Sequence, residues 1–338
     1  MDPVTQGVVG MAGSQLVSTK REKKLAAALG FFTGIAADLD VLISSKTDPL
    51  LELEYHRHFT HSLAFIPIGA LICALVFYLL IPPLKRALGF SRVYLFCFAA
   101  YATHAVLDAC TTYGTQLFWP FSDARVAWNV ISVIDPLFTL PLIVILMFAI
   151  FKRSTSIGVF AAVYAVSYLL LGAVQNQRAE SLALQLAESR GHQPINLSVK
   201  PSMANIITWK SVYEYDGNYY VDAVRVLKSH RIIEGTSVDK LNLSRDFPWL
   251  DENSQQAKDV ERFRWFSNQH LALDPYNEQR IIDVRYSLLP NQVTGMWGIT
   301  LDPNANNSAH VVWSTWTRGE DNNRVKENLP KLWEMLQP

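Results

Sequence analysis

The chain has 338 residues, of which 50% are hydrophobic and 18% are charged, and its formal net charge is zero. Soluble domains average about 25% charged residues, so this composition indicates a membrane protein, and the length allows about two domains. A zero net charge gives no sign of a nucleic-acid partner. The three cysteines, Cys73, Cys97 and Cys110, lie in or beside apolar runs, which does not suggest a disulfide framework.

The first half of the chain consists mainly of apolar segments. Residues 1–18 predict a helix with Asp2 as its N-cap and Pro3 at its first position. Such a short helix barely crosses the ~30 Å hydrocarbon layer, so it either spans the membrane or lies on its surface. Five further apolar runs are long enough to span: residues 25–43, 63–82, 93–110, 133–151 and 157–174. We therefore expect a mainly α-helical polytopic membrane domain with five or six spans over residues 1–175.

Lysine and arginine residues cluster in alternate connections between these runs, at residues 20–24, 85–92 and 152–153. The positive-inside rule places these three connections in the cytoplasm. With six spans, both ends of the chain then face the other side of the membrane. We therefore expect a multi-pass protein whose C-terminal domain is extracytoplasmic.

Histidines and carboxylates gather at the ends of the apolar runs that this topology places on the outer face. They are Asp38, Asp40, His56, His61, His104 and Asp108. The topology was drawn from lysine and arginine alone, yet it brings all six residues to one side. Ionisable residues are rare in membrane segments and usually functional there. The four-residue spacing of His104 and Asp108 also places that pair on one face of a helix.

Nitrogen and carboxylate ligands without thiolate suit a divalent metal, with Zn²⁺ expected first and Mn²⁺ or Fe as alternatives, in one or two ions. A metal-activated water would be the nucleophile. Asp38 and Asp40 are two residues apart and cannot share a helical face. We expect Asp40 to be a ligand, together with the three histidines and Asp108, and Asp38 to orient a histidine or act as the base.

Arg57 lies between His56 and the neighbouring His58. Its guanidinium matches the geometry of an anionic substrate oxygen, which is the catalytic role we expect for it. A salt bridge to Asp38, Asp40 or Glu54 explains it equally well. We expect His58 to face solvent.

The composition changes after residue 174, where an amphipathic helical extension at residues 175–190 ends at Gly191. Asp216-Gly217 lies between two alternating runs, at residues 206–215 and 219–227, and predicts a β-hairpin. The remaining predictions are a helix at residues 257–271, strands at residues 280–288, 292–301 and 310–316, and a closing helix at residues 323–336. We expect residues 176–338 to form a small α+β soluble domain with an antiparallel sheet.

Several motifs together resemble a known family. They are Asp38-Leu-Asp40, His56-Arg-His-Phe-Thr-His-Ser62, Thr103-His-Ala-Val-Leu-Asp108, Thr111-Thr-Tyr-Gly114 and Trp119-Pro120. They are similar to those of the YdjM-like, LexA-regulated inner-membrane family, whose members are regarded as metal-dependent hydrolases. The resemblance covers roughly residues 1–175 and implies location in a bacterial inner membrane. It also implies a distant similarity to zinc-dependent phospholipase C enzymes, which favours phosphoester substrates.

Many members of that family carry an N-terminal Thr-His pair, which in this chain is Thr5-Gln6. Glutamine is a poor metal ligand, so one ligand is absent or Gln6 binds substrate. We expect Gln6, Thr60 and Thr103 to contact the ligand side chains without binding the metal themselves.

Our leading hypothesis is a membrane-bound metal-dependent hydrolase that acts on a membrane lipid or lipid-linked phosphoester. The alternative is a metal-ion or proton transporter, because intramembrane ionisable groups also line transport pathways. A transporter would place its ligands near the midplane, whereas these groups cluster at one end of the spans. A third hypothesis is a non-catalytic envelope scaffold that binds through the C-terminal domain. The sequence leaves protein partners open.

Overall fold

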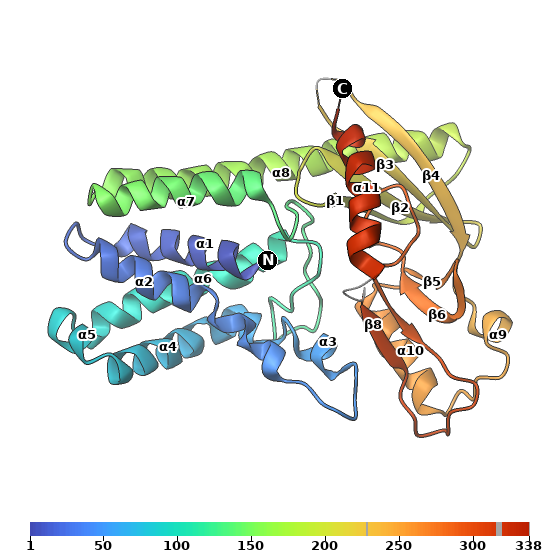
Figure 1. The fold of residues 1–338 in the computed structure, drawn as a ribbon, viewed down its shortest axis with the longest axis horizontal. Helices are drawn as coiled ribbons and strands as arrows, with labels where there is room; N and C mark the ends of the chain where they lie inside the picture. Colours follow the sequence, from blue (N-terminus) through green and yellow to red (C-terminus); the bar gives the residue numbers. More distant parts are fainter. Residues whose placement is uncertain (228, 316–319, 338) are drawn as a thin grey trace. The chain divides into compact units, whose positions relative to one another are not determined.

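The computed structural model describes residues 1–227, 229–315 and 320–337 (Figure 1). These residues divide into two compact units. The first contains Met1–Ile43, Tyr55–Val174 and Met203–Asn205, and the second contains Ser44–Glu54, Gln175–Ser202 and Ile206–Pro338. The chain therefore leaves the first unit at residue 44 and returns to it at residue 55.

The first unit is helical. Its elements are α1 (Pro3–Val17), α2 (Lys23–Gly34), η1 (Ala36–Leu42), η2 (Phe59–His61), η3 (Leu63–Phe65), α4 (Ile66–Leu80), α5 (Pro82–Ala87), α6 (Phe90–Cys110), α7 (Pro136–Phe151) and the first part of α8 (Thr155–Ser189). The predicted start of α1 is confirmed: Pro3 is its first residue, and Asp2 accepts a hydrogen bond from the backbone N–H of Thr5 at 3.0 Å. Asp135 caps α7 in the same way.

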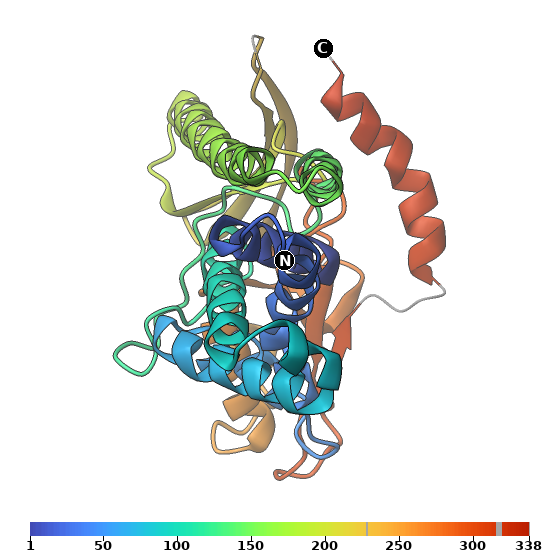
Figure 2. The same ribbon diagram turned by 90° about the vertical axis from the view of Figure 1, so that its left-hand side faces the viewer.

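Helix α1 packs against α2 and α6, and the three helices lie side by side in both views (Figures 1 and 2). Glycines allow this close approach. A Cβ atom on Gly10 would lie 2.5 Å from the Gly30 carbonyl oxygen and 2.7 Å from Gly34 Cα. Small residues at helix crossings are typical of membrane bundles. This packing brings the first turns of α1 against the segments that carry the candidate ligands.

The number of membrane spans differs from the expected five or six. Among the described residues, four helical segments are long and apolar enough to span: Lys23–Leu42, Leu63–Leu80, Phe90–Cys110 and Thr155–Ser189. Helix α1 has only 15 residues and α7 only 16, which at 1.5 Å per residue gives each about 23 Å. Both are therefore shorter than the ~30 Å hydrocarbon layer. Large apolar side chains on α4, α7 and α8 are exposed, as in Leu79, Val144 and Leu170, which suits contact with lipid.

The second unit contains two four-stranded antiparallel sheets, where one sheet was expected. The first has the order β1 (Ile195–Pro201), β2 (Thr208–Tyr215), β3 (Asn218–Arg225) and β4 (Arg231–Asp239). The second has the order β5 (Leu271–Asp274), β6 (Asn277–Asp283), β7 (Trp297–Thr300) and β8 (Val312–Thr315). The helices are α9 (Leu243–Asp246), α10 (Gln255–Phe266) and α11 (Glu320–Leu336), with α3 (Leu51–Tyr55) in the inserted segment.

The predicted hairpin is confirmed as β2 and β3, with Asp216 and Gly217 both at positive φ in its turn. The helix expected to reach residue 271 instead ends at Phe266, because Asn268 and Gln269 have left-handed φ values of 47° and 68°. Leu271 then begins β5. Strands β1, β4 and β5 were not predicted. The last residue of the strand expected at 310–316 lies outside the described residues.

Candidate metal site

Four side chains meet where η1, η2 and α6 come together. Asp38 lies on η1, His61 on η2, and His104 and Asp108 lie one turn apart on α6. One potential ligand atom from each lies within 4.8 Å of the others. Both histidines and Asp108 have no exposed surface, and the side chain of Asp38 is 18% exposed. Four of the six residues expected from the sequence therefore lie together, which is enough donor groups for a metal ion.

The two histidines are fixed by contacts on their outer nitrogens. His104 Nδ1 donates to the Gly34 carbonyl oxygen at 2.6 Å. His61 Nδ1 lies 3.1 Å from Asp40 Oδ2 and 3.0 Å from Thr60 Oγ1. Because Nδ1 is the hydrogen-bond donor in both rings, each Nε2 is left with a lone pair that points inward. This is the arrangement in which metal-binding histidines are usually held.

With Nδ1 donating in both rings, the inward-facing atoms all have lone pairs, which a cation between them would satisfy. The two Nε2 atoms are 2.8 Å apart. Asp38 Oδ1 lies 3.3 Å from that of His61 and 3.4 Å from that of His104, and Asp108 Oδ2 lies 3.2 Å from that of His61. Among the described residues, Asp38 Oδ2 has no hydrogen-bond partner, and Asp108 Oδ2 accepts no well-aligned hydrogen bond although it forms an ion pair with Arg57. Two neutral imidazoles and two carboxylates in this arrangement fit a divalent cation.

Asp40 lies outside this group of four. Its carboxylate accepts hydrogen bonds from His56 Nδ1 at 2.8 Å, the Arg57 backbone N–H at 2.9 Å and Thr60 Oγ1 at 3.0 Å. Asp40 therefore holds the segment that carries the histidines, and Asp38 faces the donor atoms. This geometry favours the reverse of the division expected from the sequence, in which Asp40 was the ligand. His56 also lies outside the group, with its ring near Tyr113.

Arg57 is buried and forms a salt bridge with Asp108, not with Asp38, Asp40 or Glu54. Its Nε lies 3.1 Å from Asp108 Oδ2, its Nη1 donates to Thr111 Oγ1 at 2.8 Å, and its guanidinium lies over the Tyr113 ring. Its backbone has a left-handed φ of 65°, which costs a non-glycine residue about 1–2 kcal/mol. Backbone hydrogen bonds to Asp40 and from Gln116 hold this conformation. Strained backbone that is held in this way is common at functional sites.

The supporting residues are partly those expected. Gln6 Nε2 donates to Asp108 Oδ1 at 2.7 Å, so Gln6 contacts a candidate ligand, and Thr60 contacts Asp40. Thr103 is different, because its hydroxyl donates to the Ala100 carbonyl oxygen in its own helix. His58 does not simply face solvent, because it packs against the rings of Tyr55, Phe59 and Trp119.

The sequence did not assign roles to the Gly34 carbonyl group, Thr111 or Tyr113. The last two belong to the Thr111–Gly114 motif, which was noted without a function. The amine of Met1 also hydrogen-bonds to Asp108. No sequence pattern points to the carbonyl of Gly34, because a backbone acceptor has no residue signature.

The family described as YdjM inner membrane protein matches residues 1–179, which is more than half of the chain. The chain belongs to the YdjM family. The matched region contains every candidate ligand and supporting residue described above, so the expected family is confirmed and the chain is of an inner-membrane type.

Two curated relatives match part of the chain. "Inner membrane protein YbcI" of Escherichia coli (strain K12) is 38% identical over 110 residues, which are 31% of this chain and 60% of the relative. "Uncharacterized protein YfhP" of Bacillus subtilis (strain 168) is 27% identical over 136 residues, which are 40% of this chain and 37% of the relative. The chain therefore spans less than two thirds of either relative. No solved structure matches it.

Proposed function

We propose that this YdjM-family protein is a membrane-embedded, metal-dependent hydrolase. The observation that carries the proposal is the cluster of Asp38, His61, His104 and Asp108, whose donor atoms lie within 4.8 Å of one another. Both histidines present Nε2 to the centre, and one carboxylate oxygen of the cluster, Asp38 Oδ2, has no hydrogen-bond partner among the described residues. A divalent cation, Zn²⁺ first and Mn²⁺ or Fe as alternatives, would supply Lewis acidity for hydrolysis.

The surrounding residues have separate tasks in this proposal. Asp40 and the Gly34 carbonyl group keep the two histidines in the binding tautomer. The Arg57 guanidinium lies beside Asp108 and supplies the positive charge for an anionic substrate oxygen. His56, whose side chain is 22% exposed and bonded to Asp40, is the group that can pass a proton between the buried site and solvent.

The proposed substrate is a lipid or lipid-linked phosphoester. On η1 the residues beside the two aspartates are apolar and exposed, with Leu39 63% and Leu42 75% exposed. The short helix that carries Asp38 therefore also offers a surface for acyl chains. The basic connections at residues 20–24 and 85–92 support an extracytoplasmic position for the site. The second unit lies on the same side in the topology in which α7 also crosses the membrane.

Metal analysis of the purified full-length protein in detergent tests the proposal, together with hydrolysis assays on lipid phosphoesters. We expect bound Zn²⁺ or Mn²⁺ in the wild type and its loss in His61→Ala and His104→Ala, since each removes a donor nitrogen. Thr103→Val is the matched control, because Thr103 precedes His104 yet bonds only within its helix. If both histidine variants keep the wild-type metal content, the proposed site is wrong. If metal-loaded protein hydrolyses no phosphoester while ion flux depends on the same residues, the function is transport.

A further inference from the structure

The segment Ser44–Glu54 joins the two parts of the candidate site along the chain but belongs to the second unit. Before it come Asp38 and Asp40. After it, Tyr55 alone separates Glu54 from His56. Whatever holds this segment therefore limits the freedom of the stretch that leads to His61.

One side chain of α10, Arg262, binds the segment at two points, Asp48 and Glu54. Arg262 Nη1 and Nη2 donate to the two carboxylate oxygens of Asp48 at 2.9 Å each, and Arg262 Nε donates to Glu54 Oε1 at 2.6 Å. Asp48 in turn accepts from the backbone N–H of Leu50 at 3.0 Å, at the start of the turn that leads into α3. The guanidinium thus spans the whole of that turn.

The arginine itself has a firm anchor. Its Nη1 also donates to Asp259 Oδ1 at 2.9 Å, and the carboxylate of Asp259 is fully buried. Asp259 further accepts from His310 Nδ1 at 2.8 Å and from the Val311 backbone N–H at 3.2 Å. Bidentate, charge-assisted hydrogen bonds between partly buried groups are stronger and more directional than ordinary surface ion pairs.

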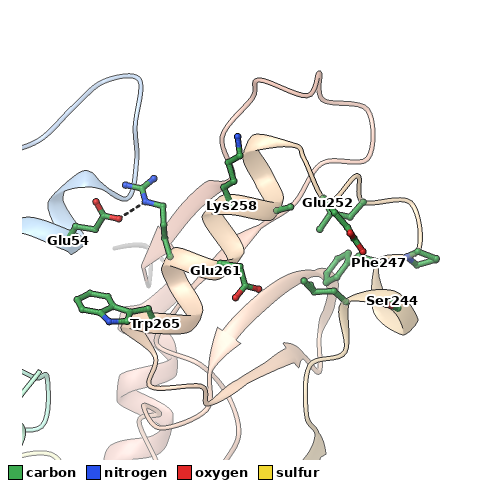
Figure 3. Close-up of a pocket in the computed structure, with 12 residues that line it drawn as sticks. Glu54, Ser244, Phe247, Glu252, Lys258, Glu261 and Trp265 are labelled. Atoms are coloured by element: carbon green, nitrogen blue, oxygen red, sulfur yellow. Dashed lines mark hydrogen bonds and ion pairs between the residues drawn. The ribbon is translucent and has the colours of Figure 1, made fainter. Parts of the chain in front are cut away.

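The protonation equilibria agree with this geometry. Hydrogen bonding to Glu54 raises the pKa of Arg262 above its ordinary value. Partial burial favours a higher pKa for Asp48, but its bonds from Arg262 hold the pKa below the ordinary value. Figure 3 shows the ion pair of Glu54 beside a cavity of about 820 Å³ that runs along α10 past Glu261 and Trp265. The contact is therefore partly open to solvent rather than part of a packed core.

We propose that Arg262 is a positioning residue for the candidate metal site. By holding Asp48 and Glu54, it fixes the segment that returns the chain to His56 and His61. The inference rests on the proposed metal site. Loss of the arginine would leave the segment 44–54 free to move and would widen the range of positions open to His61. Losing a group that is hydrogen-bonded to a metal ligand typically weakens metal binding about 10–100-fold. Arg262 acts on the ligands only through the chain, so its loss should have an effect at or below the lower end of that range.

The test compares Arg262→Met and Arg262→Lys with Arg264→Met as the matched control. Arg264 lies on the same helix but pairs with Glu261, which is exposed. Zn²⁺ affinity of the full chain in detergent is measured by chelator competition, and hydrogen exchange is followed over residues 44–61. We expect Arg262→Met to weaken Zn²⁺ binding several-fold, up to about tenfold, and to speed exchange over residues 44–61. Arg262→Lys should recover part of the affinity, and Arg264→Met should match the wild type.

Arg262→Met with wild-type affinity and wild-type exchange would overturn the role of the arginine. If Arg262→Met fails to fold, the Asp48→Ala, Glu54→Ala double variant removes the same contacts while leaving Arg262 bonded to Asp259, and the same result is expected. Failure of the proposed function has a different signature. The wild type would then bind no Zn²⁺ or Mn²⁺, while the exchange of residues 44–61 would still depend on Arg262.

Discussion

Gly34 connects the packing of the helices to the chemistry of the site, and Gly34→Ala tests that connection. A Cβ atom there would lie 2.5 Å from the Gln6 carbonyl oxygen, 3.1 Å from Gly10 Cα and 3.2 Å from Gly7 Cα. All three atoms are backbone, so no side-chain rotation relieves the overlap. Helices α1 and α2 must separate by about 0.9 Å to reach ordinary van der Waals contact, and overpacking of this kind costs about 1–3 kcal/mol.

The separation of α1 from α2 also affects two candidate metal ligands, His104 and Asp108, because each is hydrogen-bonded to one of these helices. The Gly34 carbonyl accepts from His104 at 2.6 Å, and Gln6 donates to Asp108 at 2.7 Å. Separating α1 from α2 strains at least one of these hydrogen bonds. We therefore expect Gly34→Ala to lower Tm by about 2–10 °C and to weaken Zn²⁺ binding about tenfold. Thermal unfolding in detergent and chelator competition measure the two effects.

Gly158→Ala is the matched control, because it adds the same methyl group at a position with room for it. The nearest atom to its Cβ would be Gln15 Cβ at 3.5 Å, an ordinary contact. Replacing glycine by alanine within a helix stabilises it by about 0.5–1 kcal/mol, so this variant should have an unchanged or higher Tm. If Gly34→Ala behaves as Gly158→Ala does, in both Tm and Zn²⁺ affinity, the argument from close packing is refuted.

Three further outcomes are expected. Asp38→Asn should lose bound Zn²⁺ and Asp40→Asn should retain part of it, as measured by metal analysis of purified protein; the opposite pattern would restore the division expected from the sequence. Burial lowers the pKa of Lys210 to about 7, so the unfolded chain binds a proton between pH 7 and 10.5 that the folded unit does not. The second unit should therefore lose a few kcal/mol of stability as pH falls from 10.5 to 7. Denaturant titrations of wild type and Lys210→Met at pH 7 and 9.5 check this, and a wild type without that pH dependence would contradict it. Finally, if α7 crosses the membrane as the sequence predicts, a periplasm-active reporter fused after residue 338 should be active and a cytoplasm-active one silent. The reverse result would mean that α7 does not cross and that the second unit is cytoplasmic.

The sequence predicted those parts of the fold that depend on local chemistry. A capping aspartate followed by proline located the start of α1, and Asp216-Gly217 located the hairpin, because each feature needs only its neighbours in the chain. Strand β4 was missed because most of its residues are exposed, which leaves no alternation of apolar and polar residues to detect. The number of spans was overestimated because the apolar composition of a run does not reveal where its helix begins and ends. Two of the expected spans, α1 and α7, form helices shorter than the ~30 Å hydrocarbon layer.

Four of the six residues expected from the sequence meet in the candidate site, whereas Asp40 and His56 lie outside it, and the roles within the site were not predictable. Polar residues at the ends of apolar runs were recognisable in a sequence of low charge. The distinction between Asp38 and Asp40 depends on how η1, a 3₁₀ helix, turns each carboxylate. That orientation is set by contacts with Thr60 and the histidines, which come from a separate part of the chain. The importance of Arg262 was hidden for the same reason, since Asp48 is 214 residues away from it.

That separation also sets an order of events during synthesis. A ribosome adds about 5–20 residues per second, so the segment with Asp48 emerges about 10–40 s before the arginine that will hold it. The membrane helices have time to insert while the stretch between Asp40 and His56 is still unrestrained. A nascent chain therefore carries every metal-ligand candidate well before it carries the residue that fixes their spacing. If Arg262 positions the site as proposed, the site can reach its final geometry only late in biosynthesis, after the preceding helices have been synthesised.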